Sequence, residues 1–68
     1  MTLISELINS GSKVLRKNLI SSHQLDSELI LSKILKKSRE NLLISLDEKV
    51  SDENSFEFNL LLKRRIKK

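Results

Sequence analysis

The stretch SHQLDSELILSKIL, from Ser22 to Leu35, decides how the rest of this 68-residue chain is predicted to fold. Its aliphatic side chains occupy most of a helix circumference instead of one narrow stripe. Asp26 and Glu28 stand near its N-terminal end and lysines follow at its C-terminal end, which is the placement that the helix dipole favours. A helix that is apolar on several sides requires neighbours on several sides. We therefore predict the central helix of a small bundle, with Ser21 or Ser22 as its N-cap.

A first helix is predicted before it, from Thr2 as N-cap to about Ile20. The apolar positions follow the three-and-four spacing of one helix face; they are Leu3, Ile4, Leu7, Ile8, Val14, Leu15 and Leu19. Gly11 falls on this face, where it costs about 1 kcal/mol relative to alanine. The apolar stripe keeps its phase across the glycine. We therefore favour close approach of a neighbouring backbone at Gly11 over a break in the helix.

Two more helices are predicted after the central one. Ser38 is expected to cap a short helix that turns Leu42, Leu43 and Leu46 inward, and residues 47–49 are a polar connection. Ser51, followed by two acids, is expected to cap a last helix that begins near residue 52. Its predicted inner side holds Phe56, Phe58, Leu60, Leu61, Leu62 and Ile66. No strand is predicted, so the expected fold is an all-α bundle of four, or five, short helices.

The composition limits the class of protein. The chain is long enough for one domain only, and it has no cysteine for a disulfide framework or a thiolate metal site. No apolar run approaches the roughly 18 residues that cross a bilayer. The N-terminal stretch carries Glu6 within its apolar run and no basic leader, so no signal peptide is expected. We expect a soluble cytoplasmic protein with no membrane partner.

Residues for catalysis, metal binding or cofactor binding are not found. His23 is the only histidine and has no second ligand at a suitable spacing, so it is interpreted as a solvated residue near a helix start. Asp26 and Glu28 are two apart on a helix, so their side chains diverge, and they are interpreted as helix-end charges. A single glycine excludes a phosphate-binding glycine loop.

The last eight residues, LLKRRIKK, hold five basic side chains in a chain with a net charge of +4. Such a tail suits a solvated helix end, where the dipole favours cations. It also suits contact with nucleic acid phosphates, although no aromatic residues are interleaved for base stacking.

Four motifs occur in a characteristic order: L-D-x-E-L-I-L at 25–31, R-E-x-L-L at 39–43, a serine followed by a phenylalanine (S-x-x-x-x-F) within 51–57, and L-L-x-R-R at 61–65. Together they cover nearly the whole chain, and it resembles the N-terminal domain of the HemK/PrmC family. These enzymes methylate the glutamine of the GGQ motif in class-one peptide chain release factors. The resemblance implies a helical N-terminal domain, residues 1–68, cut from a longer methyltransferase chain. The family's many helix alanines are absent here, and Ser, Ile and Lys replace them.

The resemblance also implies different roles for this domain and for the rest of the parent protein. The parent protein would bind S-adenosyl-L-methionine in a separate catalytic domain, because the family's Asn-Pro-Pro-Tyr motif and glycine-rich site are not in this chain. This fragment would have no activity and would help to bind the release factor. We expect the exposed cations near the second helix connection to contact that partner; they are Lys33, Lys36, Lys37 and Arg39. Arg64 and Arg65 are expected near the junction with the catalytic domain.

Two other hypotheses remain open at this point. One is a free-standing nucleic-acid-binding bundle that uses the basic C-terminal tail. The other is a purely structural unit that shields the catalytic domain.

Overall fold

The computed structural model describes residues 2–67, which form four helices and one very short sheet. In chain order the elements are β1 (Thr2–Leu3), α1 (Ile4–Lys17), α2 (His23–Leu35), α3 (Arg39–Leu43), β2 (Lys49–Val50) and α4 (Asp52–Ile66). The predicted all-α bundle of four helices is confirmed. The prediction that no strand forms is wrong, because β1 pairs antiparallel with β2, with Thr2 opposite Val50.

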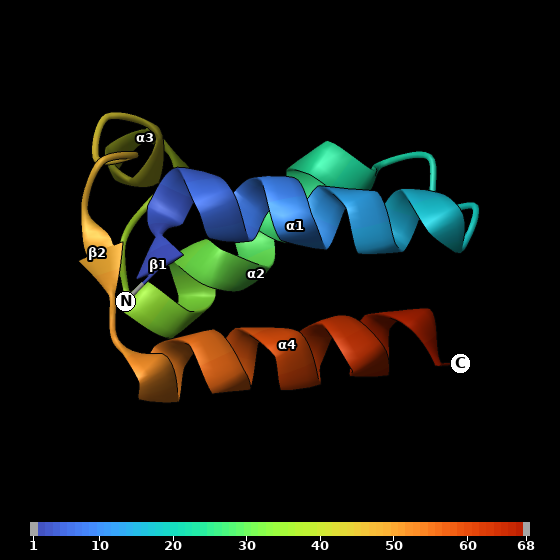
Figure 1. Ribbon diagram of the computed structural model, residues 1–68. Coiled ribbons are helices and arrows are strands. Elements are labelled where there is room, and N and C mark those ends of the chain that lie inside the picture. The colour runs from blue at the N-terminus through green and yellow to red at the C-terminus, as the bar shows by residue number, and fades with distance from the viewer. Residues whose placement is uncertain (1, 68) are drawn as a thin grey trace.

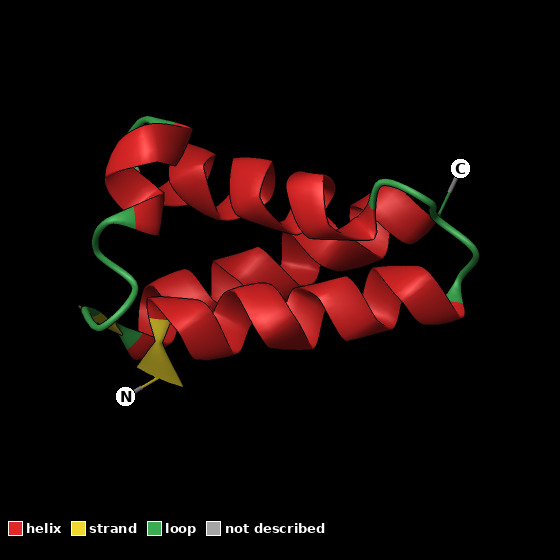
Figure 2. Ribbon diagram, turned by 90° about the horizontal axis from the view of Figure 1, so that it is seen from above, coloured by secondary structure: helices red, strands yellow, loops and turns green. Residues whose placement is uncertain are grey.

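Helix α2 lies at the centre of the bundle, as predicted. It contacts α1, α3 and α4. Helices α1 and α4 run in the same direction and α2 runs in the opposite one, while α3 and the two strands close one end (Figure 1). Figure 2 shows the same arrangement from above, with the two chain ends at opposite ends of the bundle.

The ends of α2 agree closely with the prediction. Ser22 occupies the N-cap position, but its hydroxyl accepts no hydrogen bond from the helix backbone; it donates one of 3.0 Å to Asp26 instead. The helix ends at Leu35, and Lys36 then takes a left-handed conformation with φ 56°.

The start of α1 differs from the prediction. Thr2 is not the N-cap; it lies in β1, and Leu3 is the cap residue. Leu3 has no side-chain oxygen, so the free backbone N–H groups of the first turn find other acceptors. The Leu3 N–H donates to the Glu6 carboxylate at 2.9 Å, and the Ile4 N–H donates to the Glu48 carbonyl at 2.9 Å. The connection before β2 therefore caps this helix.

Gly11 lies inside a continuous α1, so the helix does not break there. A Cβ atom at this position would lie 2.6 Å from the Ser27 Oγ and 2.7 Å from the Phe58 Cζ. The predicted close approach is confirmed, but the neighbours are side chains of α2 and α4 and not a backbone. The three long helices meet at this point.

Helix α1 ends at Lys17, three residues before the predicted end at about Ile20. Leu19 has φ 62°, outside the helical region, and is 94% exposed. It was predicted on the apolar face, and that prediction is wrong. Asn18 supports the end of the helix, because its side-chain amide donates to the Val14 carbonyl at 2.8 Å.

Helices α3 and α4 begin at the predicted serine caps. The hydroxyls of Ser38 and Ser51 accept hydrogen bonds from the N–H groups of Asn41 and Asn54, at 3.2 and 3.3 Å. Of the three leucines expected to face inward near α3, Leu42 is fully buried, whereas Leu43 is 37% exposed. Leu46 is partly buried and lies beyond the end of α3. The buried core comprises Ile4, Leu7, Ile8, Leu15, Leu31, Leu42, Val50, Phe58 and Leu62.

Candidate partner-binding surfaces

The four cations predicted to contact a partner lie around the connection between α2 and α3. Lys33 is in the last turn of α2, Lys36 is its C-cap, and Arg39 is the first residue of α3. Lys33, Lys36 and Arg39 are exposed, whereas Lys37 is partly buried. The structure thus brings the four residues to one region but gives them different surroundings.

Arg39 is held by an ion pair within the chain. Its Nε lies 2.7 Å from the Glu28 Oε1, and the Glu28 side chain is only 6% exposed. The second Glu28 oxygen accepts from the Gln24 amide at 3.0 Å. Glu28 is therefore a buried, satisfied carboxylate that ties α2 to α3, and the interpretation of it as a helix-end charge is incomplete. Residues 28 and 39 are eleven apart in sequence, so no local pattern indicated this pair.

Replacing Arg39 by alanine is expected to lower the free energy of unfolding by about 1–3 kcal/mol, because it leaves the buried Glu28 carboxylate without its cation. The measurement is urea denaturation followed by circular dichroism. The matched control is Lys36→Ala, which removes an exposed cation of the same region and should change stability by less than about 0.5 kcal/mol. Equal effects of the two variants would contradict this role for the pair.

Lys37 is paired with Glu48, in the connection before β2. Its Nζ lies 3.1 Å and 3.2 Å from the two Glu48 carboxylate oxygens. The hydrogen bond from Lys37 is the main cause that lowers the pKa of Glu48 from its ordinary value of 4.5, with a further contribution from Ser45. Both side chains are partly solvated, so the pair adds little to stability.

The Glu48 carboxyl is expected to titrate below pH 4.5 in the folded protein. Its stabilising contribution is then complete above that pH and is lost as the pH falls through the lowered pKa. Titration of the Glu48 carboxyl by NMR measures this directly. The Lys37→Ala variant should move the pKa back toward 4.5, and an unchanged pKa in that variant would show that Lys37 is not its cause.

The two arginines predicted near a domain junction differ in their contacts. Arg65 Nη2 lies 2.9 Å from the Asp26 Oδ2, which joins the last turn of α4 to the first turn of α2. Arg64 is exposed. Asp26 is thus a helix-end charge, as predicted, but with a specific partner 39 residues along the chain.

His23 is less solvated than predicted. It is partly buried, and its Nδ1 lies 2.6 Å from the Ser12 hydroxyl of α1. Within residues 2–67 no three side chains of the metal-binding types gather at one place. His23 therefore has a structural contact between α1 and α2.

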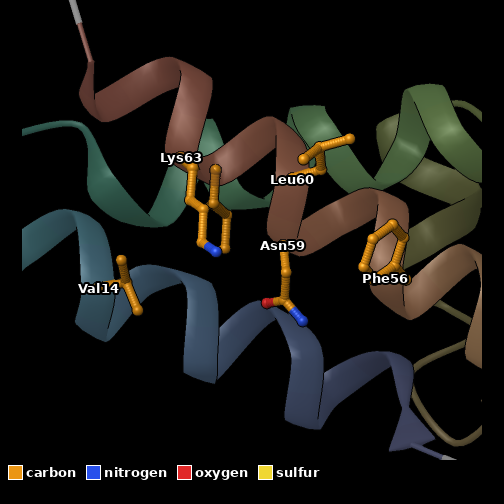
Figure 3. Close-up of a pocket in the computed structure, with 6 residues that line it drawn as sticks. Val14, Phe56, Asn59, Leu60 and Lys63 are labelled. Atoms are coloured by element: carbon orange, nitrogen blue, oxygen red, sulfur yellow. The ribbon is translucent and has the colours of Figure 1, made fainter.

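A groove lies between α1 and α4 (Figure 3), with a volume of about 410 Å³. The residues that line it are Val14, Phe56, Asn59, Leu60, Leu62 and Lys63. Phe56 is 71% exposed, Leu60 41% and Val14 38%. Phe56 and Leu60 were predicted on the inner side of the last helix, and that prediction is wrong. Phe58 and Leu62 were predicted on the same side and are buried, so that part of the prediction is confirmed.

No helix in the described part of the chain is long and apolar enough to cross a membrane.

A family model described as the PrmC N-terminal domain matches residues 6–68. The chain is 38% identical over 64 residues to a bifunctional methyltransferase of Rickettsia felis, and 36% identical over 64 residues to one of Rickettsia conorii. It is 33% identical over 63 residues to a release factor glutamine methyltransferase of Clostridium botulinum.

These matches cover 93–94% of the present chain, but only 12% of the two Rickettsia proteins and 22% of the Clostridium protein. The chain therefore spans less than a quarter of the length of these relatives. No solved structure matches it significantly.

Proposed function

This chain belongs to the PrmC N-terminal domain family, and we propose that it binds the substrate of a release factor glutamine methyltransferase. The proposed substrate is a class-one peptide chain release factor, and the methylated group is the glutamine of its GGQ motif. The proposal is carried by the family match over residues 6–68, which includes most of α1 and all of α2, α3 and α4.

In this proposal the chemistry belongs to a separate catalytic domain of a longer parent protein. That domain would bind S-adenosyl-L-methionine, which supplies the methyl group. The chain has a single glycine, so it has no glycine-rich loop for this cofactor. That glycine, Gly11, is enclosed by side chains of α2 and α4. We propose no catalytic step for it, and we place the parent in the cytoplasm, where release factors act.

The contribution of the domain is binding energy remote from the reacting glutamine. Contacts away from the reacting atoms help to hold the substrate in the orientation that the reaction requires. A bundle fixed by a buried core and by ion pairs between helices suits this role, because little order is lost when the partner binds.

Lys33 and Lys36 are the members of the predicted cluster that we propose as partner contacts. No ion pair within residues 2–67 includes either of them. Lys37 and Arg39 are proposed to assist through the positive charge of the region, since both already have carboxylate partners. Arg64 and Arg65 are proposed to lie near the catalytic domain.

The proposal is tested by titrating purified release factor into this domain and measuring the dissociation constant. The double variant Lys33→Ala, Lys36→Ala is expected to weaken binding by about tenfold. Charged side chains at an interface raise the association rate of the partners, so their removal lowers the affinity. The control is Lys49→Ala, an exposed lysine on β2, which should bind like the wild type. Unchanged binding by the double variant would remove these residues from the interface.

The same titration with structured RNA at two salt concentrations tests the nucleic-acid alternative. That alternative predicts affinity falling by roughly 0.9 log unit per log unit of salt for each phosphate neutralised. Salt-sensitive RNA binding without release factor binding would replace the proposed function.

A further inference from the structure

The groove between α1 and α4 exposes an apolar surface that the fold leaves uncovered. Phe56, Asn59, Leu60 and Lys63 have the spacing of one helix face, and all four line it from α4 (Figure 3). No residue of α2 lines the groove, so it opens on the side of α1 and α4 away from the central helix. An aromatic ring that is 71% exposed beside two exposed aliphatic residues is typical of a protein contact.

Charge changes sign along this groove. Asp52 and Glu53 stand in the first turn of α4, one turn before Phe56. At the other end Lys63 lines the groove, and Lys17 follows Val14 by three residues on α1. No ion pair within the described chain includes Lys17 or Lys63. The end of the groove near the last turns of α1 and α4 therefore offers unpaired positive charge.

Helix α2 already packs against another side of α4. It runs antiparallel to α4 (Figure 1). Asp26 in its first turn pairs with Arg65 in the last turn of α4 at 2.9 Å. An acid in the first turn of a helix is also favoured by the helix dipole. A second antiparallel helix on the open side would repeat this arrangement with Lys63 and Lys17.

We propose that the α1–α4 groove binds an amphipathic helix of the release factor, antiparallel to α4, with acidic residues in its first turn. The apolar face of that helix packs on Phe56, Leu60 and Val14, and its acids lie against Lys63 and Lys17. The inference rests on the proposed function, because the occupant belongs to the proposed substrate. It adds an apolar anchor to the lysine contacts proposed above.

Matched variants of the isolated domain test the apolar part. Phe56→Ser is expected to weaken release factor binding about 30-fold, as for the loss of a central interface residue, and Leu60→Ser somewhat less. The control is Leu25→Ser in the first turn of α2, because Leu25 is 43% exposed and Leu60 is 41% exposed. Circular dichroism confirms that each variant is folded before binding is measured.

Charge reversal tests the orientation. Lys63→Glu should weaken binding about tenfold or more, whereas Lys49→Glu, at the opposite end of the bundle, should leave it unchanged. A photo-crosslinking residue in place of Asn59, which lines the groove, then identifies the occupant. The expected crosslink is to a helical segment of the release factor that carries acids at its N-terminal end.

The two proposals fail in different ways. If the wild-type domain does not bind the release factor, the proposed function is wrong, and this inference is wrong with it. If the wild type binds and Phe56→Ser, Leu60→Ser and Lys63→Glu bind equally well, the groove is not the binding site and only the inference is overturned. A crosslink from position 59 to a basic or non-helical segment also overturns it.

Discussion

Replacing Phe58 by alanine is expected to lower the free energy of unfolding by about 3–5 kcal/mol, as for other large-to-small changes at buried aromatic residues. Phe58 is 0% exposed, and its ring lies against the Gly11 region of α1 from its position on α4. Small domains have total stabilities near the lower end of the usual range of about 5–15 kcal/mol. The Phe58→Ala variant should therefore be largely unfolded, which circular dichroism and urea denaturation will measure.

The other phenylalanine is the matched control. Phe56 is 71% exposed two residues earlier on the same helix, and Phe56→Ala should change stability by no more than about 0.5 kcal/mol. A large loss of stability in Phe56→Ala, with little loss in Phe58→Ala, would mean that the inner face of α4 has been assigned wrongly.

Gly11→Val is expected to destabilise the domain by about 2 kcal/mol through overpacking. Even a Cβ atom at this position would lie 2.6 Å from the Ser27 Oγ and 2.7 Å from the Phe58 Cζ. Both neighbours are 0% exposed, and the Ser27 hydroxyl donates to the Ile8 carbonyl at 2.9 Å, so neither moves freely. The gain in helix propensity over glycine is well under 1 kcal/mol for valine and does not offset the clash. Thermal denaturation measures the change.

Ser10→Val is the control for Gly11→Val, because Ser10 is the preceding residue of α1 and is exposed. It should alter the melting temperature by only a few degrees. A second check is the Phe58→Leu background, where the shorter side chain leaves room near position 11, so Gly11→Ala should cost less there than in the wild type. Wild-type stability of Gly11→Val would show that the three helices do not meet closely at this residue.

Local signals made the helices predictable. Ser38 and Ser51 cap their helices through their hydroxyls, because such a cap depends on only a few neighbouring residues. Ser22 takes the expected N-cap position without a side-chain cap hydrogen bond. The packing role of Gly11 was also predictable, since a glycine on an otherwise apolar helix face indicates a close contact.

Features that depend on distant parts of the chain were not predictable from the pattern. The two strands have two residues each, too few for an alternating pattern, and they form because the connection before α4 returns to the start of α1. The apolar residues of α4 cover more than one face. Only the positions of α1 and α2 determine that Phe58 and Leu62 are buried while Phe56 and Leu60 are exposed.

The candidate contact residues show the same limit. Lys33, Lys36, Lys37 and Arg39 were correctly expected near one connection, because they are close in sequence. The partners of Arg39 and Lys37 could not be expected. Glu28 lies eleven residues before Arg39, and Glu48 lies eleven residues after Lys37, each on another segment. Two of the four cations therefore have a structural contact that a charge pattern alone does not indicate.

NMR titration of the isotopically labelled domain with purified release factor measures whether the domain itself binds this partner. We predict saturable shifts or line broadening at the groove residues Val14, Phe56, Asn59, Leu60 and Lys63 and at Lys33 and Lys36, with the buried core unchanged. A spectrum that stays the same under an excess of release factor would contradict the claim.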